Sequence, residues 1–175
     1  LLDLPVVEAV NFIRRAEFLE RPALAATLGH ALPERFLLVT FHPVTLDPIP
    51  TLDQVRELLA ALAALPAETG IIFTFANADA EGAQINQMLV AFAETRAHTH
   101  CHPSLGPTRF QSLMRLSAAI VGNSSSGLYE APSFDVPTVN IGRRQDGRLR
   151  AASVIDCPPQ RDAIAHAVKR ALATR

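Results

Sequence analysis

Short runs of consecutive apolar residues recur along the sequence at intervals that suit buried β-strands. The strongest are 36–41, 71–75 and 118–121. A strand covered on both faces, as in a parallel sheet, has this composition. Shorter or more polar strand candidates are 98–101, 137–141 and 153–156. The pattern therefore predicts a sheet whose main strands are buried.

Segments with apolar residues at helical spacing alternate with these runs. The predicted helices are 15–29, 52–62 (closed by Pro66), one that begins after an N-cap at Asp79, one that opens at Gly106-Pro107, and 161–172. Regular alternation of strand and helix predicts an α/β fold, a three-layer Rossmann-like parallel sheet with helices on both faces. Residues 1–14 show no clear period, and we interpret them as a linker ahead of a single domain over 15–175.

Composition narrows the classes of protein to consider. The net charge of −1 gives no support to binding of nucleic acid or of a membrane surface. Cys101 and Cys157 lie far apart and form no CxxC pair, which favours a reduced, cytoplasmic protein. No apolar run approaches the length of a membrane span. The chain begins at Leu1, and we expect a fragment of a longer protein.

The segment 121–130 is the most informative stretch for function. A glycine ends an apolar run, three serines and a second glycine follow, and a helix is expected to begin. Free backbone N–H groups at a helix start, together with serine hydroxyls, can hold a phosphate. The alternative is an ordinary strand–turn–helix connection with serine capping.

Ligands of open parallel sheets bind beyond the carboxyl ends of the strands, so the polar residues there are the candidates. They are His42, Asn77, Asp79, 104–108, 124–126 and 142–145. Ser124 and Ser125 suit a diphosphate, and Arg144 can neutralise phosphate from its loop. Glu130, displaced from the serines, can accept hydrogen bonds from two ribose hydroxyls. The alternative for Arg144 is a solvated basic loop.

Two common nucleotide motifs are missing, and one metal motif stays open. Leu128-Tyr129 replaces the Lys and Ser/Thr pair of a Walker A loop, which argues against an ATPase. No G-x-G-x-x-G follows the first strand, which argues against an NAD-type fold. The histidines of 98–102 could share one face of a strand and bind zinc, although exposed histidines at a strand end are the simpler interpretation.

Four motifs in order resemble the UDP-N-acetylglucosamine 2-epimerases. They are LVTFHPVT at 38–45, FANAD at 75–79, VGNSSSG at 121–127 with Glu130, and PTVNIG at 137–142 with Arg144-Gln145 and Gly147-Arg148. The His-Pro-Val-Thr and Asn-x-Asp elements resemble the hydrolysing, sialic-acid-pathway branch, which releases N-acetylmannosamine and UDP. Relatives that act on UDP-linked diacetamido-bacillosamine share these elements, so the identity of the sugar in the substrate stays open.

The resemblance implies the C-terminal half of a two-domain GT-B fold, with the N-terminal half absent from this chain. It implies that His42 and Asn77 face the diphosphate and sugar and that the backbone near Leu105 reads the uracil. Ser124 and Ser125 would then hold phosphate, Glu130 the ribose hydroxyls, and Arg144 the UDP portion.

The family reaction is anti-elimination of UDP to a 2-acetamidoglucal, followed by addition of water with inversion at C2. His42 is the candidate catalytic residue of this half, and the scheme needs no metal and no cofactor. The isolated domain is expected to be inactive. The resembled family is often dimeric, which makes a homodimer of the full-length protein one option, and the oligomeric state stays open. Alternatives are a non-catalytic nucleotide-sugar-binding module and the donor half of a GT-B glycosyltransferase.

Overall fold

The computed structural model of the chain describes residues 4–44, 47–77 and 79–174. Its strands are β1 (Phe36–Thr40), β2 (Gly70–Thr74), β3 (Thr99–His102), β4 (Ala119–Gly122), β5 (Thr138–Ile141) and β6 (Val154–Cys157). Its helices are α1 (Leu4–Arg15), α2 (Arg21–Leu28), α3 (Thr51–Ala63), α4 (Ala80–Glu94), α5 (Gly106–Leu116), α6 (Ser126–Tyr129), the 3₁₀ helix η1 (Ala131–Phe134) and α7 (Arg161–Leu172). Each strand lies within one residue of a segment predicted from the sequence.

The strands form one parallel sheet in the order β3-β2-β1-β4-β5-β6. Strands β1 and β4 are neighbours, so the chain winds outward from the centre in both directions. The direction of winding therefore reverses between β1 and β4, which makes this the point where a doubly wound sheet opens a crevice for ligands.

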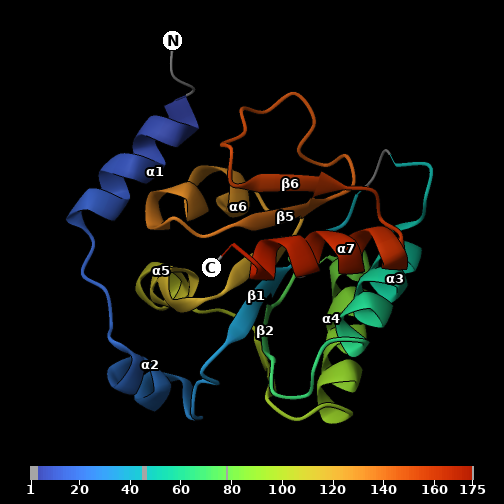
Figure 1. Cartoon of the computed structure of the whole chain (residues 1–175), viewed down its shortest axis with the longest axis horizontal. Coiled ribbons are helices and arrows are strands. Elements are labelled where there is room, and N and C mark those ends of the chain that lie inside the picture. Colours follow the sequence, from blue (N-terminus) through green and yellow to red (C-terminus); the bar gives the residue numbers. More distant parts are fainter. Residues whose placement is uncertain (1–3, 45–46, 78, 175) are drawn as a thin grey trace.

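Helices cover both faces of the sheet, as Figure 1 shows, which confirms the predicted three-layer α/β fold. Leu37 and Val39 of β1 face the layer of α3, α4 and α7. Phe36 and Leu38, the alternate residues of the same strand, face the layer of α2, α5 and η1. All five residues of β1 are buried, which is why its sequence is an uninterrupted apolar run.

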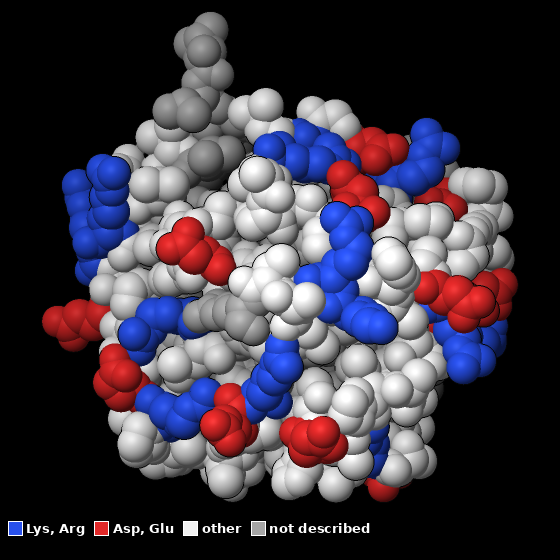
Figure 2. All heavy atoms as spheres, in the orientation of Figure 1, with Lys and Arg blue, Asp and Glu red and all other residues white. Residues whose placement is uncertain are grey.

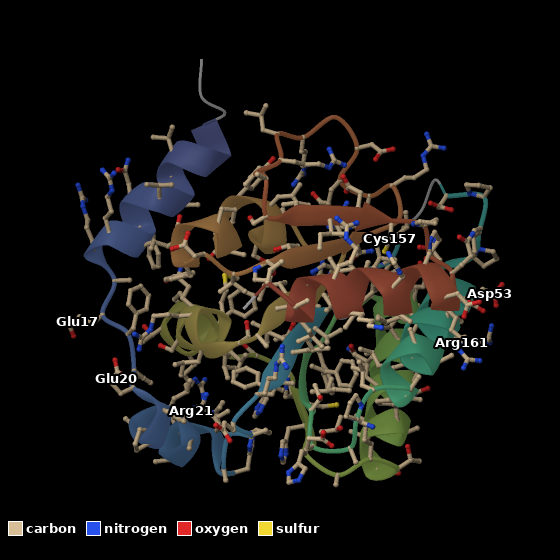
Figure 3. All side chains as sticks on the ribbon, viewed as in Figure 1. Glu17, Glu20, Arg21, Asp53, Cys157 and Arg161 are labelled. Atoms are coloured by element: carbon tan, nitrogen blue, oxygen red, sulfur yellow. The ribbon has the colours of Figure 1, made fainter. Side chains whose placement is uncertain are left out.

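Helices α3 and α7 pack together and begin at the same corner of the molecule, where Figure 3 labels Asp53 and Arg161. The backbone N–H of Arg161, the first residue of α7, donates to Oε2 of Glu57 at 2.6 Å. A carboxylate of one helix thus satisfies a free N–H group at the start of its neighbour. No helix of the described residues is long and apolar enough to cross a membrane.

The N-terminal region differs from its prediction. Residues 4–15 form a helix where we expected an irregular linker, and the helix predicted over 15–29 is confined to Arg21–Leu28. Pro22 explains the late start, because proline has no backbone N–H and fits only the first turn of a helix. Gly29 ends α2 as predicted, with a φ of 78°.

The helix expected after the serine turn is also shorter than predicted. Helix α6 has only four residues and gives way to the 3₁₀ helix η1. Pro132, which cannot donate the hydrogen bond that an α-helix needs, lies just beyond α6. A helix of one turn has little macrodipole, so this part of the argument for a phosphate site was wrong.

Candidate nucleotide site at the carboxyl edge of the sheet

Asn123 joins the ends of β1 and β4 at the switch point of the sheet. Its Oδ1 accepts a hydrogen bond from the backbone N–H of His42 at 2.7 Å, and its Nδ2 donates to the carbonyl of His42 at 2.9 Å. Asn123 is fully buried. One side chain therefore satisfies both backbone groups of His42 and fixes where this residue leaves β1.

Gly122 allows the two strand ends to approach this closely. A Cβ atom on Gly122 would lie 1.9 Å from the carbonyl oxygen of Thr40, and the residue has a φ of +136°. The backbone N–H of Asn123 also donates to that oxygen at 3.2 Å. Both the contact and the backbone conformation require glycine here.

The loop after β5 attaches to the same asparagine. The carbonyl of Asn123 accepts hydrogen bonds from Nη1 of Arg144 at 3.2 Å and from Nε2 of the buried Gln145 at 2.6 Å. Arg150 holds the loop from its other end, with Nε 3.0 Å from Oδ2 of Asp156 and Nη2 3.5 Å from Oδ1 of Asp146. The ends of β1, β4 and β5 thus meet at one residue.

The serine turn supplies hydrogen-bond donors beside this junction. The hydroxyl oxygens of Ser124 and Ser126 lie 2.7 Å apart. Within the described residues, the backbone N–H groups of Ser124 and Ser125 have no acceptor, and both serines are partly exposed. Successive free N–H groups with nearby hydroxyls can surround an anion without a long helix behind them.

A pocket of about 350 Å³ opens beside the turn. Its walls include Thr40, His42, Leu105, Phe110, Gln111, Ser124 and Glu130. The hydroxyls of Thr40 and Thr74 lie 2.5 Å apart where β1 and β2 end at this pocket. The pocket volume is at the lower end of the range of about 300–1,000 Å³ that is usual for small-molecule sites.

Glu130 and Gln111 meet in the wall of the pocket. Nε2 of Gln111 on α5 donates to Oε2 of Glu130, which directly follows α6, at 2.9 Å. Burial raises the pKa of Glu130 above its usual value, and the hydrogen bond from Gln111 acts in the opposite direction. The carboxylate is therefore a hydrogen-bond acceptor in a largely apolar surrounding.

His42 lies at the boundary between the pocket and the basic loop. Burial lowers its pKa, the positive charge of Arg144 lowers it further, and the negative charge of Asp79 opposes both. The imidazole is therefore mostly neutral at neutral pH. Its Nδ1 is buried without a hydrogen-bond partner among the described residues. Asp79 caps α4 as predicted, with its carboxylate 2.7 Å from the N–H of Gly82.

The remaining predicted site residues lie at different distances from the pocket. Leu105 is buried in its wall, and its carbonyl accepts a hydrogen bond from Nε of Arg109 at 2.7 Å. Asn77 is exposed, and neither it nor Ser125 is among the described residues that line the pocket. Arg144 is exposed, with a pKa lowered by desolvation and by the neighbouring Arg148.

The histidines of the edge strand gather away from this pocket. The ring of His30 stacks on that of His100 with centroids 3.5 Å apart, and Nε2 of His30 lies 3.0 Å from Nε2 of His102. Burial and the neighbouring histidines lower the pKa of His102 to about 4. Within the described part of the chain, no group of three or more His, Cys, Asp or Glu residues could hold a metal ion.

The two cysteines are partly buried and free. Burial raises the pKa of both thiols to about 11, so neither is a reactive thiolate at neutral pH. Figure 3 labels Cys157, which ends β6.

The sequence analysis did not predict the hydrogen-bonding roles of three residues of the site. Asn123 and Gln145 belong to the recognised motifs, but nothing in their spacing indicates that one bonds to the other. Gln111 carries a weak signal, because it is a polar residue beside apolar positions of α5 that are buried. A polar residue at such a position indicates a buried hydrogen-bond partner, although it does not identify which one.

A parallel sheet of order β3-β2-β1-β4-β5-β6, with a pocket of polar and apolar side chains at its switch point, defines the class of doubly wound α/β domains that bind ligands at the carboxyl ends of their strands. More specifically, the chain belongs to the UDP-N-acetylglucosamine 2-epimerase family, whose model matches residues 5–175. This confirms at family level the resemblance of the four motifs.

Two curated relatives illustrate the similarity. The GDP/UDP-N,N'-diacetylbacillosamine 2-epimerase (hydrolyzing) of Campylobacter jejuni is 38% identical over 149 residues, which are 85% of this chain and 38% of the relative. Polysialic acid biosynthesis protein P7 of Escherichia coli is 38% identical over 138 residues, which are 79% of this chain and 35% of the relative. The chain thus spans well under half the length of these relatives.

The solved structure of the Methanocaldococcus jannaschii UDP-GlcNAc 2-epimerase in complex with UDP-GlcNAc and UDP has a similar fold. Its TM-score is 0.66 at 12% identity, over 97% of this chain and 46% of that one. At this identity the likeness concerns the fold alone.

Proposed function

We propose that this chain is the UDP-binding half of a hydrolysing 2-epimerase that acts on a UDP-linked N-acetylated sugar. The observation that carries the proposal is the pocket at the switch point, which places His42, Leu105, Ser124 and Glu130 around one space of about 350 Å³. These residues come from three separate segments of the sequence, because Ser124 and Glu130 share the segment 121–130. The relatives' names and the nucleotide bound in the M. jannaschii enzyme support the same reading.

The nucleoside fits the side of the pocket that is formed by α5 and the residue after α6. Phe110 and Leu105 offer apolar surface, and the peptide groups near Leu105 can hydrogen-bond the polar edge of a uracil. The Glu130 carboxylate can accept hydrogen bonds from the ribose hydroxyls.

The diphosphate fits the other side, at the serine turn. The free N–H groups of Ser124 and Ser125 and the serine hydroxyls supply donors, and Arg144 supplies positive charge from its loop. Arg144 is near enough to His42 for its charge to lower the pKa of the imidazole. A bound diphosphate would therefore meet both side chains.

For the reaction, we propose loss of a proton from C2 of the sugar and cleavage of the bond from C1 to the diphosphate oxygen. The products are UDP and a 2-acetamidoglucal. Water then adds its hydroxyl to C1 and a proton to C2, with inversion at C2. His42 is the candidate to stabilise the departing diphosphate, because an anion beside the imidazole favours its protonated form. We propose that the carboxylates for proton transfer at C2 belong to a second domain.

The sugar is either N-acetylglucosamine or a diacetamido sugar. The E. coli relative is named for polysialic acid biosynthesis, which favours UDP-N-acetylglucosamine. The C. jejuni relative, with the same identity to this chain, is named for diacetylbacillosamine and favours the second sugar. Product analysis of the full-length enzyme with each UDP-sugar would separate them.

Titration of the isolated chain with UDP, followed by amide NMR, tests the binding proposal. We expect weak binding with shifts concentrated at Ser124, Ser125 and Glu130. If saturating UDP shifts none of these resonances, the nucleotide assignment is wrong.

An assay of the isolated chain with UDP-N-acetylglucosamine tests whether the reaction needs a second domain. We expect no release of N-acetylmannosamine from this chain and turnover by the full-length protein. Turnover by the isolated chain would show that no second domain is needed. A full-length protein that binds UDP but lacks turnover would instead favour a non-catalytic binding module.

A further inference from the structure

Gln111 is a buried polar residue of helix α5, next to the buried Ser112, Leu113 and Met114. Only 4% of its surface is exposed, and its neighbours Leu113 and Met114 are fully buried. Its Oε1 is buried without a hydrogen-bond partner among the described residues. An amide in this position costs free energy that an apolar side chain of similar size would not, unless its polar atoms have partners.

The partner that the structure offers is Glu130. Nε2 of Gln111 donates to Oε2 of Glu130 at 2.9 Å, and both residues line the same pocket. The hydrogen bond joins α5 to the residue that follows α6, and the whole of β4 lies between these two segments in the sequence. It occupies one oxygen of the carboxylate and leaves the other oxygen for a ligand.

We propose that Gln111 is a positioning residue that sets the selectivity of this site for ribose over 2'-deoxyribose, by holding the Glu130 carboxylate in the pocket as a hydrogen-bond acceptor. The inference rests on the proposed function, because it assumes that Glu130 binds the ribose hydroxyls. It adds to that function a residue whose effect is exerted through another side chain.

Electrostatics point the same way as the geometry. Burial raises the pKa of Glu130, and the N–H donor of Gln111 lowers it. Without this donor the carboxyl group would take up its proton at a higher pH and would lose acceptor capacity. Among the charged or titratable groups of the surrounding elements, Arg109 of α5 donates to the Leu105 carbonyl, Arg115 of α5 pairs with Glu20, and Arg148 lies over the Tyr129 ring. His42 lines the same pocket as Glu130, and burial lowers its pKa.

The test compares wild type with Gln111→Met, which keeps the length and apolar packing of the side chain and removes the donor. Calorimetry measures affinities for UDP and for 2'-deoxy-UDP. A hydrogen bond to a charged group is worth roughly 10- to 100-fold in affinity, so we expect wild type to prefer UDP by about tenfold or more. In Gln111→Met this preference should fall to less than about threefold, mainly through weaker binding of UDP.

A second readout does not depend on any ligand. Carboxyl ¹³C NMR of the free protein follows the titration of Glu130, whose pKa we expect to rise in Gln111→Met. The control is Gln54→Met, which removes another buried glutamine whose Nε2 donates to the carbonyl of Ile49. This control should leave both the titration of Glu130 and the preference for UDP unchanged.

The outcomes separate the two claims. Equal losses of UDP and 2'-deoxy-UDP affinity in Gln111→Met, or an unchanged titration of Glu130, would overturn the role of Gln111. A wild type that binds neither nucleotide would overturn the proposed function and the ribose selectivity with it. A reduced preference together with a raised pKa of Glu130 supports the inference.

Discussion

The two sides of the pocket are built in different ways. The helix wall (Leu105, Phe110, Gln111 and Glu130) is formed by packed side chains, and its single carboxylate is the only charge that it carries. The junction rim (His42, Asn123, Ser124, Arg144 and Gln145) is held by hydrogen bonds to backbone atoms and carries positive charge.

Because of this difference, ligand binding can change independently of folding on the helix wall but not on the junction rim. On the helix wall, a side chain can change while the backbone keeps its course, so selectivity can be altered without loss of the fold. On the junction rim, the groups that would bind a ligand also hold the ends of three strands together. Basic and acidic side chains are mixed on the face that Figure 2 shows.

The largest expected effect is on the junction rim, from Gly122→Ala. The new Cβ would meet the Thr40 carbonyl oxygen at 1.9 Å, and backbone atoms cannot move aside cheaply. We expect a loss of about 3 kcal/mol or more in the free energy of unfolding. Urea denaturation measures it.

Gly147→Ala is the matched control. Gly147 also has a positive φ, +79°, but a Cβ there would meet nothing within 4 Å. Its cost should be about 1–2 kcal/mol, from the backbone conformation alone. Equal costs for the two substitutions would show that the contact with Thr40 carries no weight.

Asn123→Ala should have the next largest effect. It removes both hydrogen bonds to the backbone of His42 and leaves these groups without partners at the switch point. We expect a loss of about 2–3 kcal/mol in stability and weaker UDP binding. Urea denaturation and calorimetry measure the two effects. Full stability in this variant would mean that water replaces the side chain without cost.

Arg144→Gln tests the charge of the junction rim, and it also removes the hydrogen bond from Nη1 of Arg144 to the Asn123 carbonyl. We expect UDP affinity to fall about tenfold and to depend less on salt, because the side chain is exposed and screened. Arg143→Gln is the control, since the exposed Arg143 pairs with Asp146 at 3.1 Å. If both variants lose UDP affinity equally, the rim acts through its total charge and not through Arg144.

Glu130→Gln tests the helix wall. Unlike the substitutions on the junction rim, it should raise the stability of the fold while it weakens UDP binding. The pKa of Glu130 is raised in the folded state, so its ionised form costs stability above the pKa of the unfolded chain. We expect a gain on the order of 1 kcal/mol at pH 7. The gain should disappear below about pH 4, where both states bind the proton.

Urea denaturation at both pH values measures this gain. The same stability difference at pH 7 and pH 4 would contradict the electrostatic explanation.

The smallest expected effect is a change in bound protons. Because burial and Arg144 lower the pKa of His42, the free imidazole is neutral at neutral pH, and a bound diphosphate favours its protonation. UDP binding should therefore take up a fraction of a proton, and His42→Gln should abolish the uptake. Calorimetry in two buffers of different ionisation enthalpy measures it. Equal proton uptake by His42→Gln would assign the effect to another group.

The sheet could be predicted from the sequence because its main strands are buried on both faces. Each of them is therefore a short run of consecutive apolar residues. An apolar run such as 36–41 has few other interpretations. Helix α1 was not predicted, although Val7, Val10 and Ile13 recur at helical spacing, and Ile13 is the only buried residue among 7–15. The short α6 could have been predicted from Pro132, had its missing N–H been given more weight than the serine turn.

The residues that line the pocket were easier to predict than the hydrogen bonds that hold them in place. His42 and Ser124 follow from the rule that ligands gather at strand ends, Glu130 follows from its displacement from the serines, and Leu105 follows from the family resemblance. All four line one space. The partners of Asn123 and Gln111 depend on which segments the fold brings together. A sequence read in order does not contain that information.

The carbonyl and side chain of Asn123 together contact His42, Arg144 and Gln145. Substitutions at these four positions therefore share partners, and their effects will not add. A double variant at His42 and Gln145 should differ from the sum of the single variants, although the two residues lie far apart in sequence. Relatives that differ at several of these positions have to be compared as whole sets, because the consequence of one substitution depends on which residues occupy the other three.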